Sequence, residues 1–250
     1  MLQTQSRLRY ALAATVAVHA VLLFTGFFGL VSVFDFPDIL RQPPARILER
    51  FQSHRALVQG FYAAFMWSQI AFVCVVLALR ERFGENCPPL VRAATHLGVI
   101  AGFAQAIGFA RWPFVVGGLA DRYADQPQVT LAVLDTVHRL AGVAIGEHLF
   151  FCFEALWAIA VGVQLLRDPG PTQVSKLGAG LLISIGAAIG VYSLEQFGGP
   201  FAGLGPINVL AHGALLFWLI GVATSELLRR PLRRWERLLL VGLWAATVLG

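Results

Sequence analysis

Long runs of apolar residues alternate with short polar segments along the chain and predict membrane-spanning helices. A spanning helix needs about 20 consecutive, mostly apolar residues, because the hydrocarbon core of a bilayer is about 30 Å thick. Six segments come close to or exceed this length: 10–34, 56–79, 93–120, 140–166, 177–194 and 207–225. The pattern therefore predicts an all-α polytopic transmembrane bundle over residues 1–228. Residues 229–250 form a basic loop followed by a short candidate seventh span at 238–250.

The composition supports this class and excludes several others. Hydrophobic residues make up 57% of the 250 residues and charged residues only 13%, about half of the charged fraction of an average soluble domain. So few charges could not cover a soluble surface without large exposed apolar patches. The same numbers exclude a disordered chain, a coiled coil and a disulfide-rich secreted module. The net charge of +5 does not call for nucleic acid as a partner, because the positions of the basic residues explain it.

Basic residues favour an orientation with the N-terminus inside. With that orientation, twelve of the 19 Lys and Arg residues fall in inside segments and six in outside segments, while Arg111 lies within a span. This bias follows the positive-inside rule. The first apolar run is too long for a secretory signal, so we interpret it as an uncleaved first helix. We expect a multi-pass protein of the cell (cytoplasmic) membrane.

Two outer connections are expected to be helical. One helix is expected to start near Ala45, after Pro43 and Pro44, with amphipathic first turns that lie on or rise from the outer interface. The fourth helix is expected to begin well outside the membrane. The third helix is expected to bend or end near Pro113, with Trp112 at the depth of the interface.

The fourth predicted span carries the most unusual residues for a membrane. If Arg139 and Arg167 mark its ends, Glu154 lies near the midplane and Glu147 about 10 Å nearer the outside. A separation of seven residues puts both carboxylates on one helix face. His148 lies beside Glu147, on an adjoining face. Charged groups at this depth are costly, so they are candidates for function.

Other predicted spans bring further polar residues to the same half of the bundle. Arg111 is late in the third span, Glu195 ends the fifth, and His212 lies early in the sixth. We expect a polar pocket in the outer half of the bundle, and its candidate residues are Arg111, Glu147, His148, Glu154, Glu195 and His212.

Each candidate also has a structural interpretation. Arg111 can reach the outer head groups or pair with Glu147 or Glu195. Glu195 can be solvated at the interface, and His212 can be a neutral histidine bonded to a neighbouring helix. A protonated Glu147 or Glu154 that bridges two helices would be structural as well.

Known chemical motifs fit poorly. His148 and Cys152 are one helical turn apart, but a lone pair is weak evidence for a metal, so no metal site is predicted. The three cysteines show no disulfide or zinc spacing. A haem held by His148 and His212 stays open, and the cofactors, if any, are unknown.

The segment Phe153-Glu154-Ala155-Leu156-Trp157 and the residues up to Leu166 resemble the fourth helix of a bacterial family of small polytopic membrane proteins. The Gly-rich run Leu177–Tyr192 and the stretch Phe24–Arg80 are similar to that family as well. The family is catalogued as domain of unknown function 4386, and the resemblance covers roughly residues 8–228. It implies a six-helix core in the cytoplasmic membrane, and it supplies no activity or functional residue.

Four hypotheses remain open at this point. The favoured one is a protein that binds or transports a small molecule or ion through the polar pocket, with Glu147 and Glu154 as titratable elements. The alternatives are a membrane-embedded enzyme on a lipid or isoprenoid-like substrate, a haem-bearing subunit, and a structural accessory of a larger complex. The expected partners are the lipid bilayer and a small-molecule or ion ligand; the oligomeric state stays open.

Overall fold

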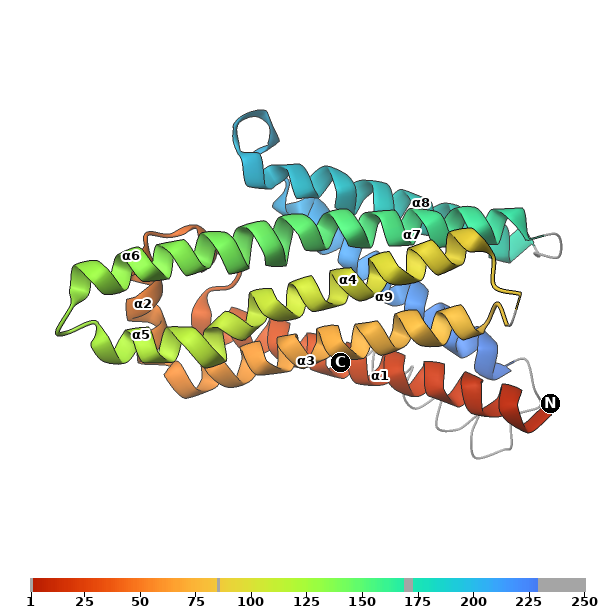
Figure 1. Ribbon diagram of the computed structural model, residues 1–250, viewed down its shortest axis with the longest axis horizontal. Helices are drawn as coiled ribbons and strands as arrows, with labels where there is room; N and C mark the ends of the chain where they lie inside the picture. Colours follow the sequence, from red (N-terminus) through yellow and green to blue (C-terminus); the bar gives the residue numbers. More distant parts are fainter. Residues whose placement is uncertain (1, 85, 169–172, 229–250) are drawn as a thin grey trace.

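The computed structural model describes residues 2–84, 86–168 and 173–228, and these residues form an all-helical bundle (Figure 1). The long helices are α1 (Leu2–Phe34), α3 (Arg55–Glu81), α4 (Pro89–Arg111), α7 (Phe150–Arg167), α8 (Gln173–Tyr192) and α9 (Gly205–Leu228). The shorter elements are η1 (Asp38–Arg41), α2 (Pro44–Ser53), η2 (Trp112–Val116), α5 (Gly117–Arg122), α6 (Pro127–Val137), η3 (His138–Leu149), η4 (Ser193–Phe197) and η5 (Gly199–Phe201).

Six helical segments of the described chain are long and apolar enough to cross a membrane. They are Leu8–Phe34, Arg55–Glu81, Pro89–Arg122, Pro127–Arg167, Lys176–Phe197 and Gly205–Leu227. The predicted all-α, multi-span class is therefore confirmed. The basic segment 229–237 and the candidate seventh span 238–250 lie outside the described residues.

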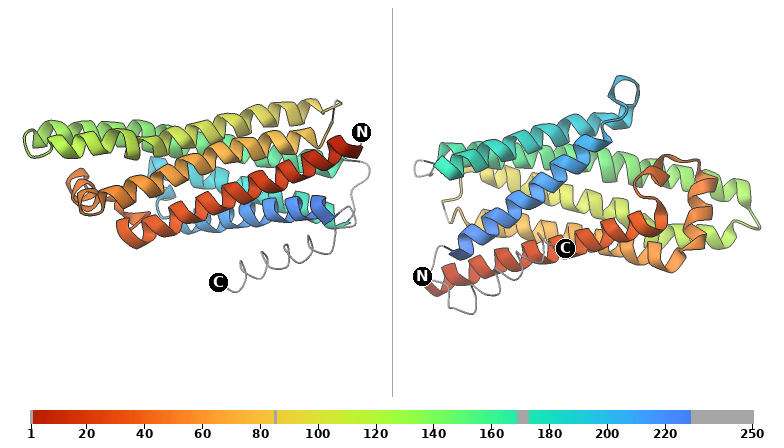
Figure 2. Two further views of the ribbon diagram at one scale, coloured as in Figure 1. Left: turned by 90° about the horizontal axis from the view of Figure 1, so that it is seen from below. Right: turned by 180° about the vertical axis from the view of Figure 1, so that it is seen from behind.

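The long helices pack in a closed sequence of neighbours. α1 packs on α3, α3 on α4, α4 on α7, α7 on α8, α8 on α9, and α9 returns to α1. One end of the bundle carries the start of α1 and the end of α9. The other end carries η1, α2, α5 and α6 and is called the capped end below. Arg9 of α1 contacts Glu226 of α9 near the N-terminal end, and in the right-hand view of Figure 2 α9 slopes away from α1 towards the capped end.

The predicted amphipathic segment after Pro43 forms α2, which begins at Pro44, where the missing N–H of proline is no loss. Its apolar residues Ile47, Leu48 and Phe51 are buried, and Phe51 packs on the ring of Trp112. This face therefore packs on the protein. A backbone break at His54 separates α2 from α3, where the sequence indicated one continuous helix.

Widened helical turns interrupt two of the long helical segments, Pro89–Arg122 and Pro127–Arg167. η2 and η3 are π-helical, with hydrogen bonds from residue i to i+5 that are common at functional sites. The widened turn η2 contains Pro113, which has no N–H to donate to the regular ladder. The chain then continues in helical form to Arg122. Trp112 is fully buried, so its side chain faces the protein core.

Two apolar clusters form the core. One surrounds Phe72 and Trp157 in the N-terminal half of the bundle. The other surrounds Tyr62 and Trp112 at the capped end. A polar cavity lies between these clusters. The first cluster contributes Phe151 and Tyr192 to its wall. The second contributes Tyr62 and Phe109, which packs against that cluster.

Candidate functional site

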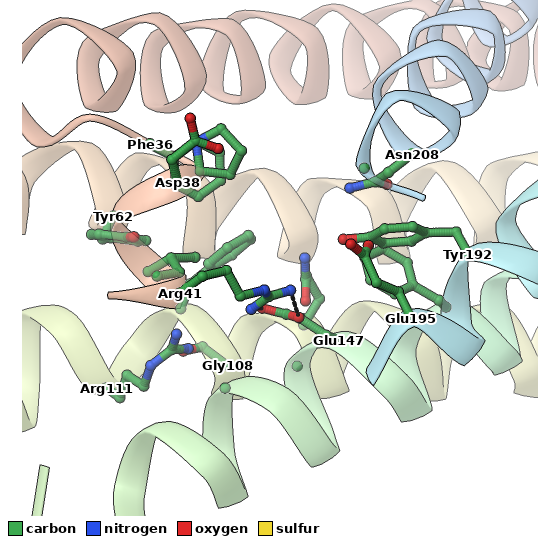
Figure 3. A pocket seen from close by; sticks show the side chains of 18 residues that line it. Phe36, Asp38, Arg41, Tyr62, Gly108, Arg111, Glu147, Tyr192, Glu195 and Asn208 are labelled. Atoms are coloured by element: carbon green, nitrogen blue, oxygen red, sulfur yellow. Dashed lines mark hydrogen bonds and ion pairs between the residues drawn. The ribbon is translucent and has the colours of Figure 1, made fainter. Parts of the chain in front are cut away.

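A cavity of about 170 Å³ opens between the two apolar clusters (Figure 3). It is built from η1, α3, α4, η3, α7, α8, η4 and α9. The polar side chains in its wall are Asp38, Arg41, Tyr62, Gln105, Arg111, Glu147, Tyr192, Glu195 and Asn208. The predicted residues Arg111, Glu147 and Glu195 therefore meet in one cavity.

An ion pair crosses this cavity from η1 to η3. Arg41 donates from a terminal guanidinium nitrogen to a carboxylate oxygen of Glu147 at 2.9 Å. Burial of the Arg41 side chain disfavours its charged form and so acts to lower the pKa. The attraction of the Glu147 carboxylate and the hydrogen bond to it together outweigh this effect of burial, so the pKa of the guanidinium is raised. The Nε2–H of His138 donates to the backbone oxygen of Leu40 at 3.0 Å. Two contacts thus hold η1 against η3.

Arg111 ends α4 and lies almost fully buried, at 6% exposure. It donates to the backbone oxygen of Gly108, and a second nitrogen lies 3.5 Å from Nδ1 of His138. A Cβ atom at Gly142 would come within 2.7 Å of its guanidinium carbon, so the glycine makes room for this side chain. The guanidinium lies 5.2 Å from the ring centre of Trp112, close enough for a cation–π attraction.

The charge of Arg111 has no carboxylate partner in the described part of the chain. Its Nε atom is buried without a hydrogen bond, and no Asp or Glu oxygen among the described residues lies within 4.0 Å of it. Neither structural interpretation of this residue therefore applies. It does not reach the exposed surface, and it is not paired with Glu147 or Glu195.

The far wall of the cavity offers hydrogen-bond acceptors. Glu195 in η4 and Asn208 in α9 each have one side-chain oxygen that is buried without a hydrogen-bond partner among the described residues. In Figure 3 these two residues and Tyr192 lie on the opposite side of the Arg41–Glu147 pair from Arg111. The cavity wall therefore has a cation without a carboxylate partner at one end and, at the other, a carboxylate and an amide that each keep one oxygen without a hydrogen bond among the described residues.

His148 does not line this cavity. Its Nδ1 atom lies 3.1 Å from the backbone oxygen of Ser193, and its ring packs edge-on against Phe197. Its Nε2 atom lies 4.0 Å from the sulfur of Cys152. Across the described residues, no group of three His, Cys, Asp or Glu side chains could hold a metal ion. His148 thus connects η3 to η4.

Glu154 and His212 form a second pair, deeper in the bundle, in which Glu154 is buried and the His212 side chain is 27% exposed. Nε2 of His212 lies 2.9 Å from a carboxylate oxygen of Glu154, and Glu154 is only 3% exposed. Nδ1 of His212 donates to the backbone oxygen of Asn208 at 3.0 Å, because a carbonyl can only accept. Both ring nitrogens of His212 are engaged, so a haem bound there would have to break one of these contacts.

The N-terminal end carries a third ionic group. Glu226 in α9 is 6% exposed, and its carboxylate lies 3.1 Å from Nε of Arg82 and 3.9 Å from Nε of Arg9. These contacts join α1, the end of α3 and α9, and they hold α1 and α9 together at this end.

Sequence reasoning missed Arg41, His138 and Gln105. Arg41 is one of the six basic residues in the predicted outside segments and served there only to indicate the orientation, although the apolar residues Phe36, Ile39 and Leu40 around it indicate a loop that folds back into the protein. Gln105 offered a clearer signal, because an amide within an apolar span is costly unless it faces the interior.

Comparison with known families agrees with the resemblance in the sequence. The family model described as Domain of unknown function (DUF4386) matches residues 11–223. No curated protein and no solved structure matches the chain. The match covers most of the 250 residues and all six candidate spans in large part. The chain therefore belongs to the DUF4386 family of multi-span helical membrane proteins.

Proposed function

We propose that this protein binds a small polar or ionic molecule in the cavity beside Arg111. The observation that carries the proposal is the guanidinium of Arg111, which belongs to the cavity wall and has no Asp or Glu oxygen within 4.0 Å among the described residues. An uncompensated charge costs about 2.5–3.5 kcal/mol at the centre of a spanning helix on insertion scales. A ligand that supplies an anionic or acceptor group would offset part of this cost.

The arrangement of the ionic groups favours binding with movement through the bundle. The Arg41–Glu147 pair lies at the cavity, the Glu154–His212 pair lies deeper, and Glu226 with its arginines joins helices at the N-terminal end. In one of its states, a transporter has a cavity near one end of the bundle and contacts that close the other end. The cavity near the capped end and the ionic contacts of Glu226 at the N-terminal end match this arrangement. In the proposed orientation the N-terminus is in the cytoplasm and the cavity lies in the outer half of a cytoplasmic membrane.

Quantification of co-purified molecules tests the binding proposal. The wild-type protein, Arg111→Gln and the control Arg46→Gln would be purified in parallel, denatured, and the released compounds measured by mass spectrometry. Arg46 is a matched control because it lies at the same capped end but is exposed and paired with Glu49. We expect a compound in near-stoichiometric amount from the wild type and the control, and at least tenfold less from Arg111→Gln. Equal amounts in all three would contradict the proposal.

A further inference from the structure

A second, apolar hollow adjoins the polar cavity. This groove has a volume of about 320 Å³ and lies between α1 and α9 over a floor from α3, α4 and α7. Phe24 and Phe28 of α1 and Val209 of α9 line it and are 42%, 62% and 53% exposed. These exposed apolar side chains belong to candidate spans, so we infer that the groove opens towards lipid between α1 and α9.

The groove and the cavity share a wall. Phe36, Gln105, Phe109, Phe151 and Asn208 line both. The two hollows are therefore neighbours, and an elongated molecule that passes between these side chains would place an apolar part in the groove and a polar part in the cavity. A purely polar ligand would use only the cavity, and the apolar groove beside it would serve no purpose.

The two ends of the cavity select the chemistry of the polar part. Arg111 presents a buried donor with a positive charge, and a guanidinium matches the geometry of a phosphate group. At the other end the carboxylate of Glu195 and the side-chain amide of Asn208 belong to the cavity wall; an ionised carboxylate accepts hydrogen bonds, and an amide both accepts and donates them. A group that fits both ends carries an anionic phosphate and, a few bonds away, an N–H or O–H donor.

We propose that the ligand of this site is a membrane phospholipid whose head group carries hydrogen-bond donors, as ethanolamine or glycerol does. One hydrocarbon chain lies in the groove between α1 and α9, the phosphate meets Arg111, and the donor group meets Glu195 and Asn208. This inference rests on the proposed function and names the substrate class of the same cavity.

Native mass spectrometry of the full chain in detergent tests this assignment with three probes. They are palmitoyl lysophosphatidylethanolamine, palmitoyl lysophosphatidylcholine and free phosphoethanolamine. The first has a chain and an N–H donor. The second has the same chain but a quaternary ammonium with no N–H, and the third has no chain. We expect at least tenfold tighter binding of the first probe than of either other probe.

Two glycines of α9 supply matched variants. A Cβ atom at Gly213 or at Gly221 meets no atom within 4 Å, but only Gly213 lines the groove. Gly213→Leu should weaken lysophosphatidylethanolamine binding at least tenfold because it fills the groove, and Gly221→Leu should leave it unchanged. Arg111→Gln should weaken binding as well, and Arg111→Lys should restore part of it.

The outcomes separate this inference from the proposed function. Equal binding of lysophosphatidylethanolamine and free phosphoethanolamine, with no effect of Gly213→Leu, would overturn the lipid assignment and leave the polar site intact. Equal binding of the two lysolipids would overturn the requirement for a donor in the head group. Binding of every probe unchanged by Arg111→Gln would overturn both proposals.

Discussion

Arg41 in η1 and Glu147 in η3 are 106 residues apart in sequence, yet their side chains form an ion pair at 2.9 Å. The pair fastens the connection between the first two spans to the fourth candidate span. It also neutralises one carboxylate of the cavity, so that of the two arginines in the cavity wall Arg111 is the one without a carboxylate partner among the described residues. The distribution of charge in the cavity therefore depends on Arg41, a residue of the connection between α1 and α3.

Replacing both members of this pair should reveal a modest coupling. Arg41→Gln and Glu147→Gln should each lower the free energy of unfolding, with a coupling of about 1 kcal/mol, because polar contacts between membrane helices average about 0.6 and reach about 1.7 kcal/mol. A double-mutant cycle by reversible unfolding in micelles measures it. The exposed pair Arg46–Glu49 is the control and should couple by about 0.5 kcal/mol or less. A coupling for Arg41 and Glu147 no larger than the control would contradict this role.

The Glu154–His212 pair should depend strongly on both partners. His212→Phe alone leaves the buried carboxyl of Glu154 unpaired, and we expect it to cost about 3 kcal/mol. Glu154→Leu leaves the partly exposed His212 with its bond to Asn208, and we expect a smaller loss, of about 1–2 kcal/mol. The double variant Glu154→Leu/His212→Phe removes both polar groups and should recover most of that loss. Unfolding free energies of the three variants check this. A double variant as unstable as the sum of the single ones would show that the two residues do not depend on each other.

Close contact between two glycines sets the distance between α4 and η3. A Cβ atom at Gly108 would lie 2.7 Å from the Cα atom of Gly146, and the reverse distance is also 2.7 Å. Gly146→Ala should therefore destabilise the protein by about 2 kcal/mol, as overpacking does. Gly118→Ala is the control, because a Cβ atom there meets nothing within 4 Å, and it should be neutral or stabilise by up to about 1 kcal/mol. Similar thermal stability of both variants would refute the contact.

The proposed orientation rests on the distribution of the basic residues and can be measured by labelling. Ala124 lies in the exposed connection between α5 and α6, and Asn86 lies in that between α3 and α4. With the native cysteines replaced by alanine, a membrane-impermeant maleimide should label Ala124→Cys but not Asn86→Cys in intact cells, because the positive-inside bias puts the N-terminus in the cytoplasm. Labelling of Asn86→Cys alone would reverse the orientation.

The sequence predicts the spans well because length and apolar composition alone decide whether a helix can cross a bilayer. It also brings Arg111, Glu147 and Glu195 to one half of the bundle, since depth along each helix follows from the rise per residue. These predictions use only positions along single helices.

The rest depends on contacts between elements. The π-helical turns of η3 change the direction of side chains along that helix, so the regular spacing used for His148 did not predict that it contacts η4. Arg41 enters the cavity through the fold of a connection, which no periodicity encodes. The pairing of Glu154 with His212 requires that α7 and α9 face each other at that depth.

An experimental density map of the protein purified from membranes, at a resolution that shows side chains, would show directly whether a phospholipid occupies this site. We expect density in the cavity within hydrogen-bond distance of the Arg111 guanidinium that continues past Phe36 and Phe109 into the groove between α1 and α9. A cavity that holds only separate water-sized peaks, with Arg111 paired to a carboxylate of the protein, would contradict it.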